Sequence, residues 1–136
     1  MKEDYLSAGL RHFSDSEVLR EQNRTDNCAY LAGYTIECGL KTVLQVHGHG
    51  VRAYGHNLHA LSGKGLALAA MLSPGLSRYH VDRITALTDA IAVWDPEMRY
   101  AKTGEVTPDA AKVVAESARA MVSEVMAVLF LDGRTN

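Results

Sequence analysis

The sequence predicts an all-α protein, and three observations lead to that class. No stretch sustains the alternation of apolar and polar residues that marks a half-buried strand. Ala, Leu, Glu, Lys and Arg dominate the long segments, and these residue types favour helices. Short stops that contain glycine or proline separate the segments. We therefore expect an up-and-down bundle of four main helices plus a short broken helix.

The N-terminal third is expected to form the first two helices. The first runs from about residue 3 to residue 23, and the polar residues 14–16 disturb it. The second begins near Asp26, where Thr25, Asp26 or Asn27 can act as the N-cap. It ends before the glycine-rich stop at residues 48–50.

The remaining segments predict a broken helix and two longer ones. The broken helix spans residues 56–72 and is interrupted at residues 63–65. The next helix covers about residues 77–93 and ends before Pro96, because the residue preceding a proline avoids the α region. The loops at 48–55 and 95–106 are the two long connections, and long loops often carry function.

The last helix has the clearest start in the chain. Thr107 can act as its N-cap, Pro108 suits the first helical position, and Asp109 places negative charge in the first turn. The helix is expected to continue to about Leu131.

Length and composition place limits on the class of protein. The chain has 136 residues, 47% of them hydrophobic and 22% charged, with a formal net charge of −2. These values predict one domain over residues 1–136 and do not favour a strongly basic nucleic-acid binder. Apolar runs fall short of the roughly 20 residues that a membrane span needs, and the start of the chain is too polar for a signal peptide. We expect a cytoplasmic protein with no membrane association.

Cys28 and Cys38 lie roughly 15 Å apart along one helix, so we expect two buried thiols and no disulfide.

The helix over residues 29–44 carries polar side chains along one stripe. Tyr30, Tyr34, Glu37 and Lys41 share a face, because residues three, four, seven and eleven apart lie together on a helix. Glu37 and Lys41 can form an ordinary surface pair, with wet tyrosine hydroxyls beside it. Alternatively, the stripe can face inward toward a pocket, a partner or an arginine at position 99.

Four histidines gather in residues 47–59. His56 and His59 could share a helix face, and histidine is a common zinc ligand. No cysteine or carboxylate lies near them in the sequence, so we expect no metal and assign no cofactor. We expect His56 to cap the third helix and to hydrogen-bond across the bundle.

Three motifs, in this order, resemble the HEPN family, the small helical-bundle domains that accompany minimal nucleotidyltransferases in prokaryotes. "LAGYTIECGLK" at 31–41 is similar to the family's signature helix, "GHNLHAL" at 55–61 to the start of its third helix, and "WDPEMRY" at 94–100 to the segment after its fourth. The matched positions are Leu31, Ala32, Gly33, Tyr34, Ile36, Glu37, Leu40, Lys41, Gly55, His56, Leu58, Leu61, Asp95, Pro96, Arg99 and Tyr100.

The resemblance implies a HEPN-like fold, a homodimer and a nucleotidyltransferase chain as partner. Many family members are metal-independent ribonucleases, often toxins of toxin–antitoxin pairs, with an arginine followed by four to six residues and a histidine. This chain lacks that spacing. A rearranged ribonuclease site therefore remains an alternative, with His80 and Arg99 as weak catalytic candidates, or Arg52 with His56 across a dimer.

The preferred hypothesis is a non-catalytic binding module for a nucleotide, RNA or phosphate-like ligand. Arg99, Tyr100 and Lys102 place a bidentate phosphate binder, a stacking surface and a second cation within four positions. Two other possibilities stay open: Arg99 pairs with Glu37 and only pins its loop, or the chain is a dimerisation domain without a small ligand. The expected ligand-binding residues are Arg99, Tyr100, Lys102, Tyr34, Glu37, Lys41 and His56.

Overall fold

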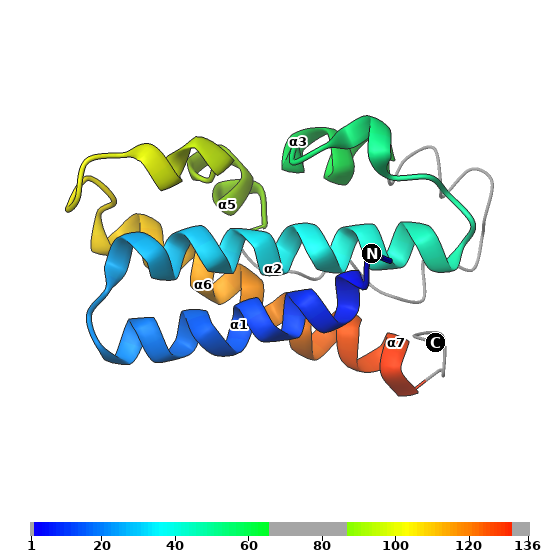
Figure 1. The fold of residues 1–136 in the computed structure, drawn as a ribbon, viewed down its shortest axis with the longest axis horizontal. Helices are drawn as coiled ribbons and strands as arrows, with labels where there is room; N and C mark the ends of the chain where they lie inside the picture. The colour runs from blue at the N-terminus through cyan, green and yellow to red at the C-terminus, as the bar shows by residue number, and fades with distance from the viewer. Residues whose placement is uncertain (1, 66–86, 132–136) are drawn as a thin grey trace.

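Two long antiparallel helices form the base of the structure. The computed structural model describes residues 2–65 and 87–131, and no strand occurs within these ranges. α1 (Tyr5–Glu21) and α2 (Thr25–Val46) lie side by side, joined by a turn (Figure 1). The expected all-α class is confirmed.

The C-terminal helix packs along the same pair. It consists of α6 (Pro108–Ala120), a wider π-helical stretch η6 (Met121–Met126) and α7 (Ala127–Leu131), which follow one another without a break. Its start agrees with the sequence: the Thr107 hydroxyl accepts a hydrogen bond from the Ala110 amide at 3.1 Å, and Pro108 is the first helical residue.

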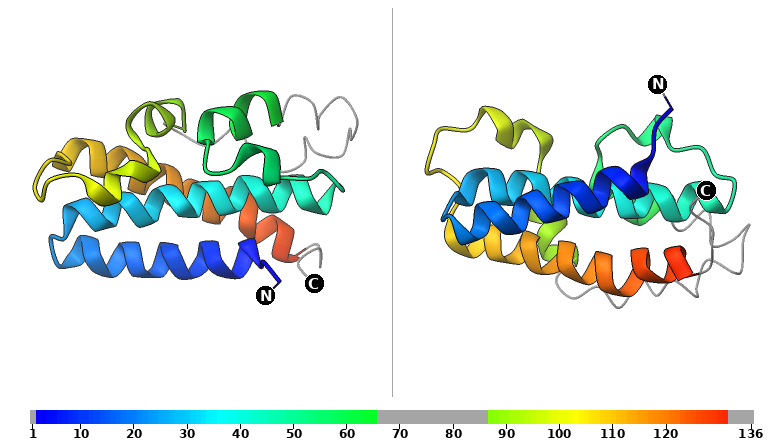
Figure 2. Two further views of the ribbon diagram at one scale, coloured as in Figure 1. Left: turned by 45° about the horizontal axis from the view of Figure 1, so that its top comes forward. Right: turned by 60° about the horizontal axis from the view of Figure 1, so that its bottom comes forward.

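Among the described residues, short elements lie on the side of α2 that faces away from α1 (Figure 2). They are η1 (Arg52–Tyr54), α3 (Leu58–Ala60), η2 (Leu61–Gly65), α5 (Leu87–Val93) and η5 (Pro96–Tyr100). One of them, α5, packs mainly against α6. The expected helix over 77–93 appears as α5 from Leu87 onward, and its earlier part lies outside the described residues. No helix in the described ranges has the length and apolar character that crossing a bilayer requires.

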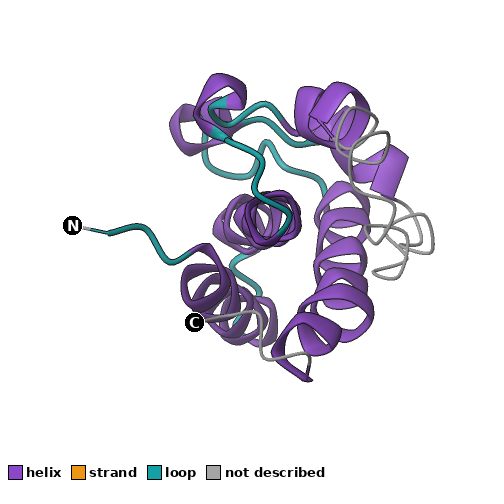
Figure 3. Ribbon diagram, turned by 90° about the vertical axis from the view of Figure 1, so that its right-hand side faces the viewer, coloured by secondary structure: helices purple, strands orange, loops and turns teal. Residues whose placement is uncertain are grey.

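α2 is the central helix, with the other elements arranged around it (Figure 3). Every residue from Thr35 to Leu44 is buried, so this part of the helix is covered on all sides. The ordinary surface pair considered for Glu37 and Lys41 is therefore wrong, because both residues are in the interior.

Two expectations about the first two helices are also wrong. α1 runs through residues 14–16 without a disturbance, because Ser16 is buried and its hydroxyl donates to the Cys28 carbonyl at 3.2 Å. α2 has no side-chain cap at its start, since the Asp26 carboxylate accepts hydrogen bonds from a distant loop instead. The end of α2 before residues 48–50 is confirmed.

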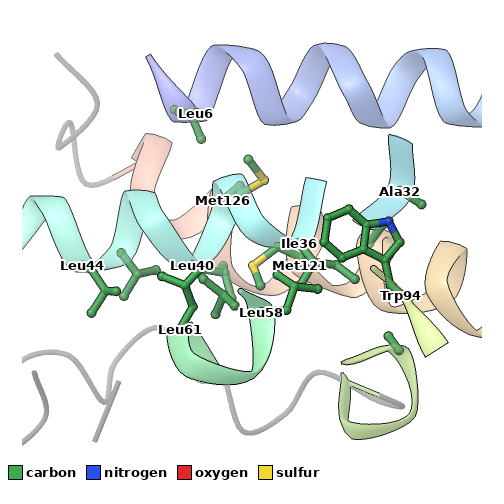
Figure 4. Close-up of a cluster of buried hydrophobic side chains, with 14 of the residues drawn as sticks. Leu6, Ala32, Ile36, Leu40, Leu44, Leu58, Leu61, Trp94, Met121 and Met126 are labelled. Atoms are coloured by element: carbon green, nitrogen blue, oxygen red, sulfur yellow. The ribbon is translucent and has the colours of Figure 1, made fainter. Parts of the chain in front are cut away.

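The core contains side chains from α1, α2, α3, η2 and the C-terminal helix, together with Trp94 (Figure 4). Met121 of the C-terminal helix packs against Gly39 of α2, and Met126 reaches Gly9 of α1, as suits a flexible side chain. Cys28 and Cys38 are both buried free thiols, as expected. The largest fully buried core residues include Ile36, Leu40, Leu44, Leu61, Met121, Met126, Leu129, Val114 and Val125.

Close approach in the core depends on glycines of α2. A Cβ atom at Gly39 would overlap the Met121 thioether, and one at Gly33 would overlap the Trp94 indole. Gly33 therefore sets the position of Trp94, which in turn begins the connection between α5 and η5.

Gly33→Ala is expected to destabilise the protein by about 1–3 kcal/mol, because the added methyl group must displace a buried indole. The single tryptophan of the chain, Trp94, reports the displacement as a change in emission maximum. Urea unfolding gives the free energy.

Gly50→Ala is the matched control, because a Cβ there meets nothing within 4 Å and its φ is not positive. Equal stability of the two variants would contradict the assigned role of Gly33.

Candidate functional site

A buried carboxylate joins the ammonium group of Lys41 and the imidazole of His56 at the middle of α2. Glu37 is 3% exposed. Its oxygens Oε1 and Oε2 lie 3.0 and 3.1 Å from the His56 Nδ1 atom, and Oε2 lies 3.4 Å from the Lys41 Nζ atom. Because a buried carboxylate without partners is costly, these two contacts make the position of Glu37 possible.

Lys41 is stabilised from a second direction by α1. Its Nζ atom lies 5.1 Å from the centre of the Tyr5 ring, which is within the range of a cation–π contact. Burial, followed by a hydrogen bond with Glu3, raises the pKa of Tyr5 to about 12. Tyr5 therefore remains a neutral ring beside the buried ammonium group.

His56 connects this interior to the surface. An ionised carboxylate oxygen can only accept a hydrogen bond, so the Nδ1–H group of His56 is the donor to Glu37. This contact defines the tautomer and leaves Nε2 as the second functional nitrogen. The side chain is 55% exposed.

The exposed imidazole borders a cleft of about 400 Å³ between the start of α3 and the end of α5. The walls combine a second imidazole, a carboxylate and aromatic rings with apolar side chains. The lining residues are Tyr54, His56, Asn57, Leu58, His59, Ile91, Trp94, Asp95 and Pro96. The cleft can therefore offer hydrogen bonds and apolar surface to a small molecule.

Tyr34 is the centre of an aromatic cluster beside the carboxylate. Its ring centroid lies 5.0 Å from that of Tyr30, 5.6 Å from His56, 5.1 Å from Trp94 and 5.8 Å from His12. Burial, followed by the hydrogen bond from the Tyr30 hydroxyl, raises the pKa of Tyr34 well above its ordinary value. Tyr34 thus holds His56 and Trp94 in place as a neutral ring and does not act as an acid near neutral pH.

Arg99 takes a different partner from the one considered in the sequence analysis. Glu37 contacts Lys41 and His56, so the Arg99–Glu37 pair is wrong. The Arg99 Cζ atom lies 4.7 Å from the centre of the Tyr100 ring. A hydrogen bond involving the Tyr30 hydroxyl, followed by the nearby Tyr100 phenol, raises the pKa of Arg99 above its ordinary value. Arg99 is therefore connected to the cluster through Tyr30.

The segment that carries Arg99 is attached at two points to the N-terminal part of α2. The Trp94 Nε1 atom donates to the Tyr30 carbonyl at 3.1 Å. The Gly104 and Val106 amides donate to the Asp26 carboxylate at 2.8 and 3.2 Å. Gly104 has φ of +89°, a conformation that glycine adopts without strain. Asp26 and Trp94 therefore connect this loop to α2, in place of the pair considered between Arg99 and Glu37.

The structure brings four of the expected ligand-binding residues together: Tyr34, Glu37, Lys41 and His56. Arg99 and Tyr100 lie exposed in η5, with the guanidinium group against the Tyr100 ring. Lys102 is an exposed residue of the same loop, and its amide donates to Glu105 at 3.1 Å. His56 bonds across the bundle as expected, but Asn57 caps α3 in its place, with Oδ1 accepting from the Ala60 amide at 2.9 Å. His80 lies outside the described residues.

Three contributors were not identified from the sequence: Tyr5, His12 and the loop-binding role of Asp26. Tyr5 and His12 reach the cluster from α1, and no spacing within α1 distinguishes them. Trp94 was quoted only within a motif. Trp94 is the single tryptophan of the chain and lies two residues before Pro96, where the expected helix ends. A lone tryptophan at a helix end was the one sequence feature that could have pointed to this cluster.

Compared with known proteins, the chain matches no family model, no curated protein and no solved structure.

Glu37→Gln is expected to lower the free energy of unfolding by about 3–5 kcal/mol, because it leaves the buried Lys41 ammonium without its counter-charge. Urea denaturation measures the change. The double variant Glu37→Gln/Lys41→Met should recover part of the loss.

Glu116→Gln is the matched control, since this carboxylate is 54% exposed and lies 4.0 Å from Lys112. It should change stability by less than about 0.5 kcal/mol. If the two glutamine variants were equally stable, the importance of the buried carboxylate would be refuted.

Stability should also depend on pH through His12. Burial, followed by the charge of Arg11, lowers the pKa of His12 below 6.5, although Asp15 and Glu37 oppose the shift. Between the folded and the ordinary pKa values, His12 is therefore protonated in the unfolded chain and neutral in the folded chain. The stabilising contribution is complete above the ordinary histidine pKa, is lost as pH falls toward the folded value, and is constant below it.

The measurement compares urea midpoints of the natural chain and His12→Gln between pH 7.5 and pH 4.5. The difference between the two proteins should shrink or reverse toward low pH. An NMR titration of the His12 ring that gave a pKa above 6.5 would contradict the assignment.

Proposed function

We propose that this chain is a non-catalytic binding module of the HEPN type, which takes a nucleotide or another phosphate-bearing ligand at the His56 cleft and the adjoining Arg99–Tyr100 surface. The resemblance of residues 31–41, 55–61 and 94–100 implies a homodimer and a nucleotidyltransferase chain as partners of this module.

The orientation of His56 is the observation that carries the proposal. A 3%-exposed carboxylate holds one nitrogen of a half-exposed imidazole that borders a cleft of about 400 Å³. Such a nitrogen can donate to or accept from a ligand without losing rotational freedom on binding. Buried polar groups arranged in this way at a cleft are typical of a binding site.

The Arg99–Tyr100 surface supplies the complementary recognition. Tyr100 is 73% exposed, and the Arg99 guanidinium group lies against its ring. A guanidinium group suits the oxygens of a phosphate, and an exposed ring can stack on a base. The half-exposed imidazole packs against Tyr34, whose hydroxyl accepts a hydrogen bond from Tyr30.

Titration of the protein with ADP, followed by the fluorescence of Trp94, tests the proposal. Trp94 lines the cleft and is the single tryptophan, so its signal reports occupancy there. Arg99→Gln should weaken ADP binding about tenfold without loss of folding, which corresponds to about 1.4 kcal/mol. His56→Gln should weaken it as well.

Arg119→Gln on α6 removes the same kind of charge away from this surface and should leave ADP affinity unchanged. No saturable response to ADP, or equal weakening by Arg99→Gln and Arg119→Gln, would sink the proposal.

One observation favours a second candidate, a metal-independent ribonuclease. A carboxylate that orients an imidazole is an arrangement used for general acid–base chemistry, and His56 is presented to a cleft in this way. Incubating the protein with RNA in the presence of a chelator separates the two candidates. Cleavage that His56→Gln abolishes supports the ribonuclease, whereas intact RNA together with ADP binding supports the module.

A further inference from the structure

A second cleft lies where α1, the beginning of α2 and α6 meet. Its volume is about 300 Å³, which is at the lower end of the range for small-molecule sites. Its lining shares no residue with the His56 cleft. The residues that line it are Arg20, Asn23, Thr25, Cys28, Pro108, Ala111, Lys112, Ala115, Glu116 and Arg119.

Two arginines on opposite helices are held at this cleft by one carboxylate. Arg20 Nη2 lies 2.8 Å from Glu17 Oε2, and Arg119 Nη2 lies 2.9 Å from both oxygens of Glu17. One carboxylate neutralises one of the two guanidinium charges, and each guanidinium retains further N–H donors. Both arginine side chains are about half exposed, so these donors are accessible.

Lys112, on the α6 side of the cleft, is only weakly paired with a carboxylate. Lys112 Nζ lies 4.0 Å from Glu116 Oε1, at the limit of an ion pair, and both side chains are exposed. With Arg20 and Arg119, the cleft therefore presents three cations against two carboxylates. The excess is about one positive charge, which suits a monoanion.

The floor of the cleft is apolar. Cys28, Ala111 and Ala115 are buried and small, and Pro108 borders them. The side chains of Cys28, Ala111 and Ala115 offer no strong hydrogen-bonding group to a polar part of a ligand. A ligand that reaches the floor must therefore place a short apolar body there. None of the described residues that line it is aromatic, so they offer no ring on which a nucleobase could stack.

We propose that this cleft binds a small organic monoanion, a carboxylate with a short aliphatic body. The carboxylate lies between Arg119, Arg20 and Lys112, and the aliphatic part contacts the floor at Cys28 and Ala115. This site does not depend on the function proposed for the His56 cleft.

Titration of the ¹⁵N-labelled protein with butyrate tests the proposal, with butyramide as the neutral probe of equal shape and inorganic phosphate as an anion without an apolar body. All titrations are made at constant ionic strength, so that screening does not change. Butyrate should cause saturable shifts in the amides of residues 23–28 and 110–119. Butyramide and phosphate should bind at least about tenfold more weakly, because each lacks one of the two interactions.

Three variants decide whether the cleft is the site. Arg119→Gln and Lys112→Gln should each weaken butyrate binding about threefold to tenfold, as expected for a charge at a partly exposed site. Ala115→Leu should block binding, because it fills the floor. Arg99→Gln serves as the matched control and should leave butyrate affinity unchanged.

Lys112 is largely exposed, so its variant should fold even if another does not. Absence of saturable shifts with butyrate, equal affinity for butyramide, or butyrate affinity unchanged in both Arg119→Gln and Lys112→Gln would overturn the proposal. Because ADP binding is measured through Trp94 and butyrate binding through the amides of this cleft, either result can fail without the other.

Discussion

The burial of the Glu37 carboxylate in the central helix is the constraint on which the surrounding structure depends. A charged group at 3% exposure needs compensation from every side. Lys41 supplies charge from the next turn, and His56 supplies a hydrogen bond from the connection that follows α2. The Tyr5 ring on α1 then stabilises the lysine. One carboxylate therefore links α2 to the connection that carries His56 and, through Lys41, to α1.

The same constraint explains why the aromatic residues gather on this side of α2. Tyr34 separates the carboxylate region from Trp94 and contacts both His56 and Trp94 edge to face. Trp94 can approach because Gly33 has no side chain, and its indole nitrogen bonds to the Tyr30 carbonyl. The position of the Arg99 loop is thereby coupled to the helix, with Asp26 as its second attachment.

The two clefts differ in the physical origin of their polarity. In the His56 cleft, the buried Glu37 carboxylate orients the imidazole, and salt screens this buried interaction little. The cleft at α1 and α6 is built from exposed pairs around Glu17 and Glu116, whose attraction to an anion weakens as ionic strength rises. Anion binding at the cleft of α1 and α6 should therefore be the more sensitive of the two to salt.

The sequence by itself determined the all-α class, the start of the last helix at Thr107 and Pro108, the end of α2 and the state of both cysteines. These properties follow from local chemistry: helix propensity, a capping hydroxyl, a fixed proline φ and the rise of a helix. It also placed Tyr34, Glu37 and Lys41 on one stripe. It did not determine that the stripe is buried, that His56 and not Arg99 reaches Glu37, or that Asp26 binds a loop about 80 residues away. Only the tertiary structure decided these contacts, because the partner of a buried charge is set by which distant segment lies nearest, and helical periodicity carries no information about that distance.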